Sequence, residues 1–211
     1  MKKLGAGLVT LLSVLMSVLL VQAFATAPAS SLSPTYAGKH FGIYLHIFAA
    51  AVALLLGPFQ FSAPLRRKLP HIHRWAGRLY LGIGVMVGGL AGLYMSLNAR
   101  GGLPAKTGFA AMASLWLYTG LQAYLSIRRG AIAEHRTWMV RNFALTFGAV
   151  TLRLWLPLAG AIGYPFEVAY PFIAWISWVP NLVVAEWFFI RGRSSAAVRA
   201  STPAERLAAS E

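Results

Sequence analysis

Long apolar stretches alternate with short basic segments along this chain. Four stretches contain no Lys, Arg, Asp or Glu and cover residues 4–38, 40–65, 79–99 and 107–127. Because ~20 apolar residues are enough to cross the hydrocarbon core of a bilayer, each stretch can hold one spanning helix. Two further stretches are apolar with few charges. The pattern therefore predicts six spans, at residues 4–25, 40–63, 73–97, 107–127, 135–160 and 170–190.

Composition agrees with a membrane protein. Of the 211 residues, 58% are hydrophobic and 11% are charged, whereas soluble domains carry ~25% charged residues. We expect an all-α integral membrane bundle: a signal-anchor or first span in residues 1–29, a membrane domain in residues 40–190 and a polar cytoplasmic tail in residues 191–211. Residues 4–25 exceed the ~7–15 residues of a signal-peptide core. We therefore favour an uncleaved first span, although small residues at 23–27 leave cleavage open.

The net charge of +14 is distributed unevenly between the connecting segments. Basic residues gather within residues 2–3, 66–78, 128–141 and 191–206, whereas the alternate connections carry only Lys39, Arg100 and Lys106. An excess of Lys and Arg marks cytoplasmic segments. We therefore predict six transmembrane helices in the plasma (inner) membrane with both termini cytoplasmic. Nucleic acid is not expected as a partner, because no separate basic domain is present to bind it.

The fifth predicted span carries a polar stripe. At 100° per residue, His135, Asn142, Thr146 and Arg153 fall within roughly 20° of one line along a helix. Lipid cannot satisfy an arginine, so the stripe should face protein or a cavity. Glu167 is the expected ion-pair partner of Arg153, because it lies on the same side of the membrane. Snorkelling to headgroups and contact with a ligand remain alternatives for Arg153.

A cluster of arginines is predicted at the cytoplasmic ends of spans three and five. Arg74, Arg78, Arg136 and Arg141 fall in the first turns of these helices, where the helix dipole disfavours cations unless an anion is present. Such a cluster predicts an anion site for a lipid phosphate, a haem propionate or an anionic substrate. Anchoring at the headgroups is the simpler alternative. Glu186 is matched in depth to Arg141 or His135.

Two histidines suggest a redox cofactor. His73 and His135 occupy equivalent depths on two helices that run in the same direction, and neutral imidazole ligates metals and haem iron. The alternative is that each ring bonds a carbonyl oxygen or Glu186. His46 lies toward the other side and has no histidine at its level. The chain contains no Cys and no Asp, which excludes thiolate ligands and Asp-based catalysis.

Several phrases of the sequence occur together: LH at residues 45–46, ALLLGPFQ at 53–60, HRWAGRLY at 73–80 and HRTWMVR at 135–141, with Arg153 beyond. This combination resembles the bacterial family of predicted membrane proteins catalogued as domain of unknown function 2306, over residues 40–155. The resemblance implies a multi-span helical membrane protein. More remotely, the phrase at 73–78 is similar to b-type cytochromes of the cytochrome b561 and ferric-reductase kind, which pair histidines at two depths. Since no histidine pairs with His46, the chain departs from that pattern: the similarity does not extend to two haems and is compatible with one inner haem.

Three functions follow from these observations. The leading hypothesis is a small membrane redox protein that holds one b-type haem or handles a quinone, with His73 and His135 as iron ligands and the arginines on the propionates. The first alternative is a carrier for a small anionic or lipid-like molecule, with Arg153 and the stripe along its path. The second is a non-catalytic accessory subunit. All three assume one lipid-shielded pocket between spans three and five.

Overall fold

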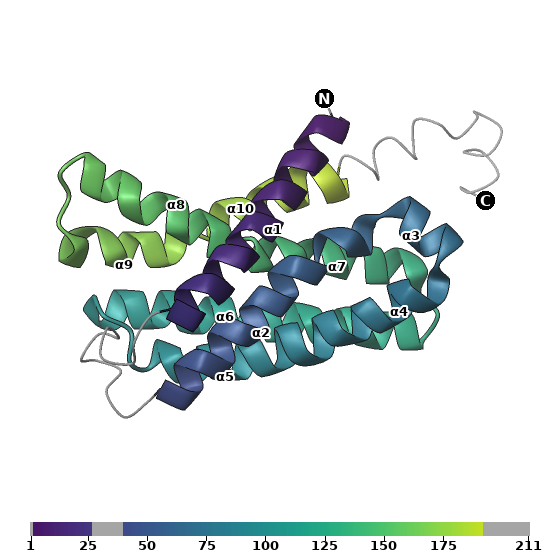
Figure 1. Ribbon diagram of the computed structural model, residues 1–211, viewed down its shortest axis with the longest axis horizontal. Helices are drawn as coiled ribbons and strands as arrows, with labels where there is room; N and C mark the ends of the chain where they lie inside the picture. Colours follow the sequence, from purple (N-terminus) through teal and green to yellow (C-terminus); the bar gives the residue numbers. More distant parts are fainter. Residues whose placement is uncertain (1, 27–39, 192–211) are drawn as a thin grey trace, which may run out of the picture.

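The computed structural model describes residues 2–26 and 40–191, and every regular element in these ranges is a helix (Figure 1). The predicted loop at residues 30–39 and residues 192–211 of the predicted tail lie outside the described residues. The elements are α1 (Lys2–Thr26), α2 (His40–Leu56), η3 (Pro58–Phe61), α3 (Ala63–Lys68), α4 (Pro70–Leu79), η4 (Tyr80–Val87), α5 (Gly88–Ser96), α6 (Gly102–Arg128), α7 (Ile132–Thr146), α8 (Gly148–Ala161), α9 (Phe166–Ile176), α10 (Val179–Val184) and η5 (Ala185–Arg191). The predicted all-α class is confirmed for these residues.

Four of the helical stretches are long and apolar enough to cross a membrane: Phe41–Phe61, Pro70–Ser96, Ile132–Ala161 and Phe166–Arg191. Helix α6 has 27 residues but is less apolar, and buried Thr119 and Ser126 lie on it in the bundle interior. The apolar part of α1 is shorter, at Gly7–Gln22. A helical membrane bundle is therefore shown, whereas the count of six spans and the side of each terminus stay predictions.

The second span ends where the sequence requires it. Pro58 has no backbone N–H and follows Gly57, so α2 stops at Leu56 and the 3₁₀ turn η3 replaces it. Ser62 then caps α3, with its Oγ accepting from the N–H of Leu65 at 3.3 Å. The basic residues Arg66, Arg67 and Lys68 fill the last turn of α3, where the helix dipole favours cations. This turn reverses the chain into α4.

The third span runs unbroken through α4, η4 and α5, and η4 is a π-helix. Its glycines allow α2 to approach closely. A Cβ on Gly84 would lie 2.8 Å from the Cβ of Ala53 and 3.0 Å from the Cα of that residue, too close for two carbon atoms. The pairing of α2 with η4 is therefore fixed by small residues, as is common where membrane helices pack.

The last two spans are interrupted at neighbouring positions. Span five breaks between α7 and α8 at Phe147, and span six breaks between α9 and α10 at Ser177 and Trp178. The carbonyl oxygen of Ser177 accepts hydrogen bonds from Thr151 Oγ1 and, at 3.0 Å, from Asn181 Nδ2. Broken backbone is tolerated at membrane depth only where protein satisfies it, and these two side chains do so.

Candidate functional site: two cavities separated by a polar network

A buried hydrogen-bond network ties η4, α6 and α7 together at the centre of the bundle. Tyr80 Oη donates to Asn142 Oδ1 at 2.6 Å and lies 2.9 Å from Thr146 Oγ1. Trp116 Nε1 donates to the same Thr146 oxygen at 2.9 Å. Tyr80 and Asn142 are fully buried, at 0% exposure. The polar stripe of α7 thus faces protein at these two levels.

Both the oxygen and the nitrogen of the Asn142 side-chain amide have hydrogen-bond partners. Its Nδ2 donates to the carbonyl oxygen of Trp116 at 2.8 Å and to Thr119 Oγ1 at 2.9 Å, while its Oδ1 accepts from Tyr80. A buried amide without partners would cost ~1–3 kcal/mol, and more where no water can reach it. The network therefore holds three helices in one relative position. Tyr80, Trp116 and Thr119 were not predicted as site residues, since their role depends on which helices meet.

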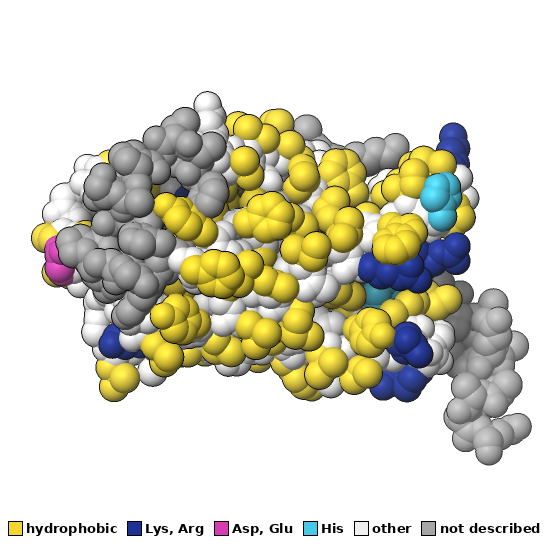
Figure 2. Space-filling model, turned by 60° about the horizontal axis from the view of Figure 1, so that its bottom comes forward, with side chains coloured by type: hydrophobic (Ala, Val, Ile, Leu, Met, Phe, Trp, Pro, Cys, Tyr) yellow, Lys and Arg dark blue, Asp and Glu magenta, His cyan; other side chains and the backbone are white. Residues whose placement is uncertain are grey.

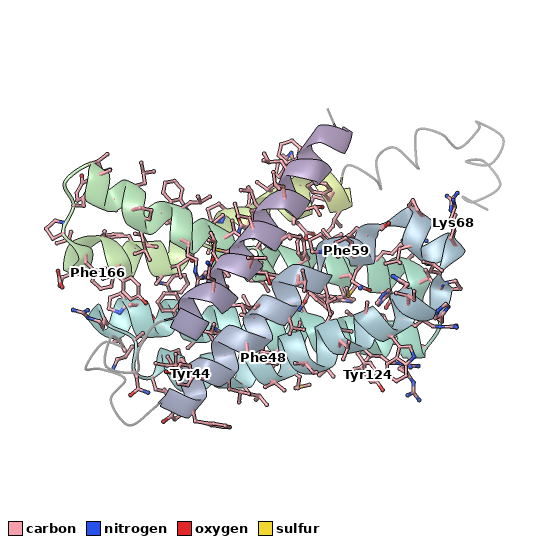
Figure 3. The ribbon with its side chains drawn as sticks, viewed as in Figure 1. Tyr44, Phe48, Phe59, Lys68, Tyr124 and Phe166 are labelled. Carbon is pink, nitrogen blue, oxygen red and sulfur yellow. The ribbon has the colours of Figure 1, made fainter. Side chains whose placement is uncertain are left out.

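A wide cavity of about 1060 Å³ opens at the basic end of the bundle, and we call it the basic cavity. Its apolar walls come from η4, α6 and α7. Its polar lining residues are Gln60, Arg66, His73, Arg74, Arg78, Arg128, His135 and Arg136. Figure 2 shows Lys and Arg side chains gathered at this end, with histidine among them. In Figure 3, Lys68 and Tyr124 mark this end, and Tyr44 and Phe166 mark the opposite one.

The two predicted histidines line the same cavity. His135 Nδ1 lies 2.8 Å from the carbonyl oxygen of Ala123. Because a carbonyl only accepts, Nδ1 carries a proton, and in the neutral ring Nε2 is therefore the nitrogen with the lone pair. His73 Nδ1 is buried without a hydrogen-bond partner among the described residues. The structure thus brings together two imidazoles from separate helices, one with a fixed tautomer and one with an unsatisfied nitrogen.

The predicted arginines divide between two environments. Arg74, Arg78 and Arg136 line the basic cavity, whereas Arg141 does not. Arg141 instead makes a bidentate ion pair with Glu186, with Nε–Oε2 at 3.0 Å and Nη2–Oε1 at 2.9 Å. The expected match of Glu186 with Arg141 is therefore present, and the Arg141 guanidinium has a carboxylate partner within the protein.

Residues 73–78 (HRWAGR) and 135–141 (HRTWMVR) are similar in sequence, and the arginine and tryptophan side chains of the two segments also make similar contacts. The Arg78 guanidinium lies over the Trp75 ring at 4.9 Å, and that of Arg141 lies over the Trp138 ring at 4.6 Å. In both pairs the arginine follows the tryptophan by three residues, which places the two side chains on one face of the helix. Spans three and five thus share a tryptophan–arginine pair of the same spacing, preceded by a histidine two residues before Trp75 and three residues before Trp138.

A second cavity, of about 400 Å³, lies beyond the network toward the opposite end, and we call it the small cavity. His46 and Arg153 both line it. The predicted Arg153–Glu167 ion pair is wrong, because Glu167 bonds Arg100 at 3.4 Å on the exposed end of α9. Arg153 Nη1 instead donates to the carbonyl oxygen of Ala149 at 2.9 Å, one turn earlier on its own helix.

The expectation of one continuous pocket is also corrected. His135 lines the basic cavity and Arg153 the small cavity, while Tyr80 and Asn142 line neither. Tyr80 and Asn142, which are hydrogen-bonded to each other, fill the space between the two cavities. The stripe of α7 and α8 therefore contributes to two separate sites.

Comparison with known families agrees with this architecture. The family model described as Predicted membrane protein (DUF2306) matches residues 43–189, well over half of the chain. The chain belongs to this family. The match includes His46, His73, His135, Arg153 and Glu186, and it confirms the resemblance drawn from the sequence motifs. No curated protein and no solved structure matches the chain.

The lining of the basic cavity in this family member fits some cofactors better than others. No group of three or more His, Cys, Asp or Glu side chains that could hold a metal ion occurs in the described part of the chain. A b-type haem requires only two axial histidines, a flat apolar space and cations for its two carboxylates. His73, His135 and the surrounding arginines supply that set of side chains. A bound ligand would also give a partner to the His73 ring, whose buried Nδ1 has none among the described residues.

Proposed function

We propose that this membrane protein is a small redox protein that holds one b-type haem in the basic cavity. The observation that supports it is the placement of His73 and His135, from separate helices, on the wall of one cavity. Fixing Nδ1 of His135 on a backbone carbonyl is the way proteins orient a histidine whose Nε2 is a ligand. Bound haem would supply one-electron transfer, and the protein would hold, orient and shield it.

The remaining side chains of the basic cavity have separate roles in this proposal. Arg74, Arg78 and Arg136 bind the haem carboxylates, since guanidinium groups pair bidentately with carboxylates. Leu81, Met86 and Leu117 form apolar walls for the macrocycle. With six spans and both termini cytoplasmic, the cavity mouth is at the cytoplasmic face of the plasma membrane. A quinone dissolved in the bilayer is the proposed electron partner.

A second candidate function comes from the cationic lining alone. A wide cavity with arginines at its mouth and apolar residues deeper inside also suits an anionic lipid-like molecule, which a carrier would move. Lipid binding uses the arginines but does not require the histidine ring nitrogens. The two functions therefore differ in their dependence on His73 and His135.

Absorption spectroscopy of the detergent-purified full-length protein tests the proposal. After incubation with haemin, we expect a Soret band that is lost in His73→Ala and in His135→Ala. His71→Ala is the matched control, because His71 is exposed in the same first turn of α4 and does not line the cavity. Absence of a Soret band from the wild-type protein after haemin treatment would refute the haem proposal. Anionic lipid retained by both histidine variants would then support the carrier.

A further inference from the structure

The small cavity has the chemistry of a binding site that is independent of the basic cavity. It is lined by residues from α2, α5, α6, α7, α8 and α9, and side chains such as Ile43, Met112 and Leu152 make most of its wall apolar. Its volume of about 400 Å³ falls within the ~300–1,000 Å³ of small-molecule pockets. The polar side chains in this wall are His46, Ser96, Thr146, Arg153, Tyr170 and Ser177.

The charge of Arg153 is not balanced within the described residues. The acidic residues there are Glu134, Glu167 and Glu186, and each bonds a different arginine, namely Arg129, Arg100 and Arg141. Arg153 donates one of its five N–H groups to the carbonyl oxygen of Ala149. A guanidinium at membrane depth is costly unless an anion or polar group offsets its charge.

Ser177 provides the second, independent observation. Its side chain is fully buried, at 0% exposure, and its Oγ has no hydrogen-bond partner in the described part of the chain. The residue lines the small cavity together with Arg153. A buried hydroxyl without a partner is destabilising, because it has lost its hydrogen bonds to water without replacement. Ser177 and Arg153 line the same cavity, so one occupant would serve both groups.

We propose that the small cavity binds a small organic carboxylate with an apolar body. The carboxylate accepts hydrogen bonds from the remaining N–H donors of Arg153 and from Ser177 Oγ, because an ionised carboxylate only accepts. The apolar body lies against the aliphatic and aromatic wall. Carboxylates match the planar fork of guanidinium, and the apolar wall disfavours strongly hydrated inorganic anions.

Binding can be measured with 4-fluorobenzoate as the probe, using ¹⁹F NMR line broadening with the full-length protein in detergent micelles. We expect saturable broadening of 4-fluorobenzoate and none of neutral 4-fluorobenzamide above that of empty micelles. Arg153→Gln should weaken binding by about tenfold or more, since a charge-assisted hydrogen-bonded pair is lost. Arg100→Gln is the matched control, because it removes an arginine outside the cavity.

Ser177→Ala gives a test that does not depend on how Arg153 variants fold. This change removes an unsatisfied hydroxyl, so the ligand-free protein should be as stable as wild type or more so, while affinity for 4-fluorobenzoate falls about tenfold. Ser13→Ala is the matched control: Ser13 Oγ is equally buried and unpartnered but does not line the cavity. Equal binding of the amide, or wild-type affinity in Ser177→Ala, would overturn the proposal. His73→Ala should bind the probe normally, which separates this site from the haem proposal.

Discussion

The two cavities place their arginines in opposite situations. At the basic cavity, Arg74, Arg78 and Arg136 are exposed at the end of the bundle, where water and lipid phosphate can reach them. At the small cavity, Arg153 lies in a mostly apolar wall and donates to a backbone carbonyl oxygen, that of Ala149. A cluster of cations at a membrane boundary is therefore weak evidence for a specific ligand. A cation such as Arg153, which lines a cavity inside the bundle and has no carboxylate partner among the described residues, is stronger evidence for a specific ligand.

The polar network lies between the two cavities and holds η4, α6 and α7 together, so its removal should have the largest effect on both cavities. Asn142→Leu keeps the volume but leaves Tyr80 Oη, Thr119 Oγ1 and the Trp116 carbonyl with fewer partners. We expect the free energy of unfolding to fall by about 2 kcal/mol. This value lies between the cost of an unsatisfied buried polar group in soluble proteins and the smaller energies of hydrogen bonds between membrane helices. Reversible unfolding in mixed micelles measures it. Haem and 4-fluorobenzoate binding should both weaken, and an effect confined to one cavity would show that the network does not position the walls of both.

Helix approach is the next test, because it positions the network without forming part of it. Gly84→Ala would place a methyl group 2.8 Å from the Ala53 Cβ and force α2 away from η4. Overpacking of this kind costs ~1–3 kcal/mol. Gly82→Ala is the matched control, since a Cβ there meets no atom within 4 Å. If thermal unfolding in detergent gave equal stabilities for the two variants, the close contact of α2 with η4 would not contribute to the fold.

The fold was more predictable than the sites, for a physical reason. Charge-free apolar runs predict membrane helices directly, and 100° spacing placed Asn142 and Thr146 on one face of α7. That face stays continuous past the break because Phe147 keeps near-helical dihedral angles, φ −65° and ψ −16°. What one helix meets on another is not encoded in its own spacing. Tyr80, Trp116 and Ser177 therefore gave no signal, although Tyr80 lies seven residues after His73 on the same helix face.

The error over Glu167 has the same origin. Counting residues along a helix estimates depth but not which neighbour a side chain reaches. Glu167 lies in the first turn of α9, where it bonds the exposed Arg100. Depth matches Glu186 to Arg141 or His135, and the pair with Arg141 is the one present, because α7 and η5 pack together. Depth was sufficient only where helix packing also brought the residues together.

The ion pair at the basic end should contribute a moderate amount to stability. Arg141 and Glu186 are 26% and 36% exposed and share two hydrogen bonds. A double-mutant cycle with Arg141→Gln and Glu186→Gln is expected to give a coupling of ~1 kcal/mol, since partial exposure screens the charges. The measurement is unfolding free energy at low salt. A coupling near zero would mean that the bidentate geometry does not hold η5 on α7.

The ion pair at the opposite end should contribute least, and it isolates the effect of exposure. Arg100 and Glu167 are 48% and 71% exposed and make one contact at 3.4 Å. The same cycle with Arg100→Gln and Glu167→Gln should give a coupling below ~0.5 kcal/mol, because water solvates both charges and salt screens them. The two cycles use the same pair of substitutions in the same protein, so their difference measures geometry and burial alone. If the exposed pair coupled as strongly as Arg141–Glu186, Glu167 would contribute to stability at the end where α6 meets α9. The two ends of the bundle would then differ in their cavities but not in the strength of their ion pairs.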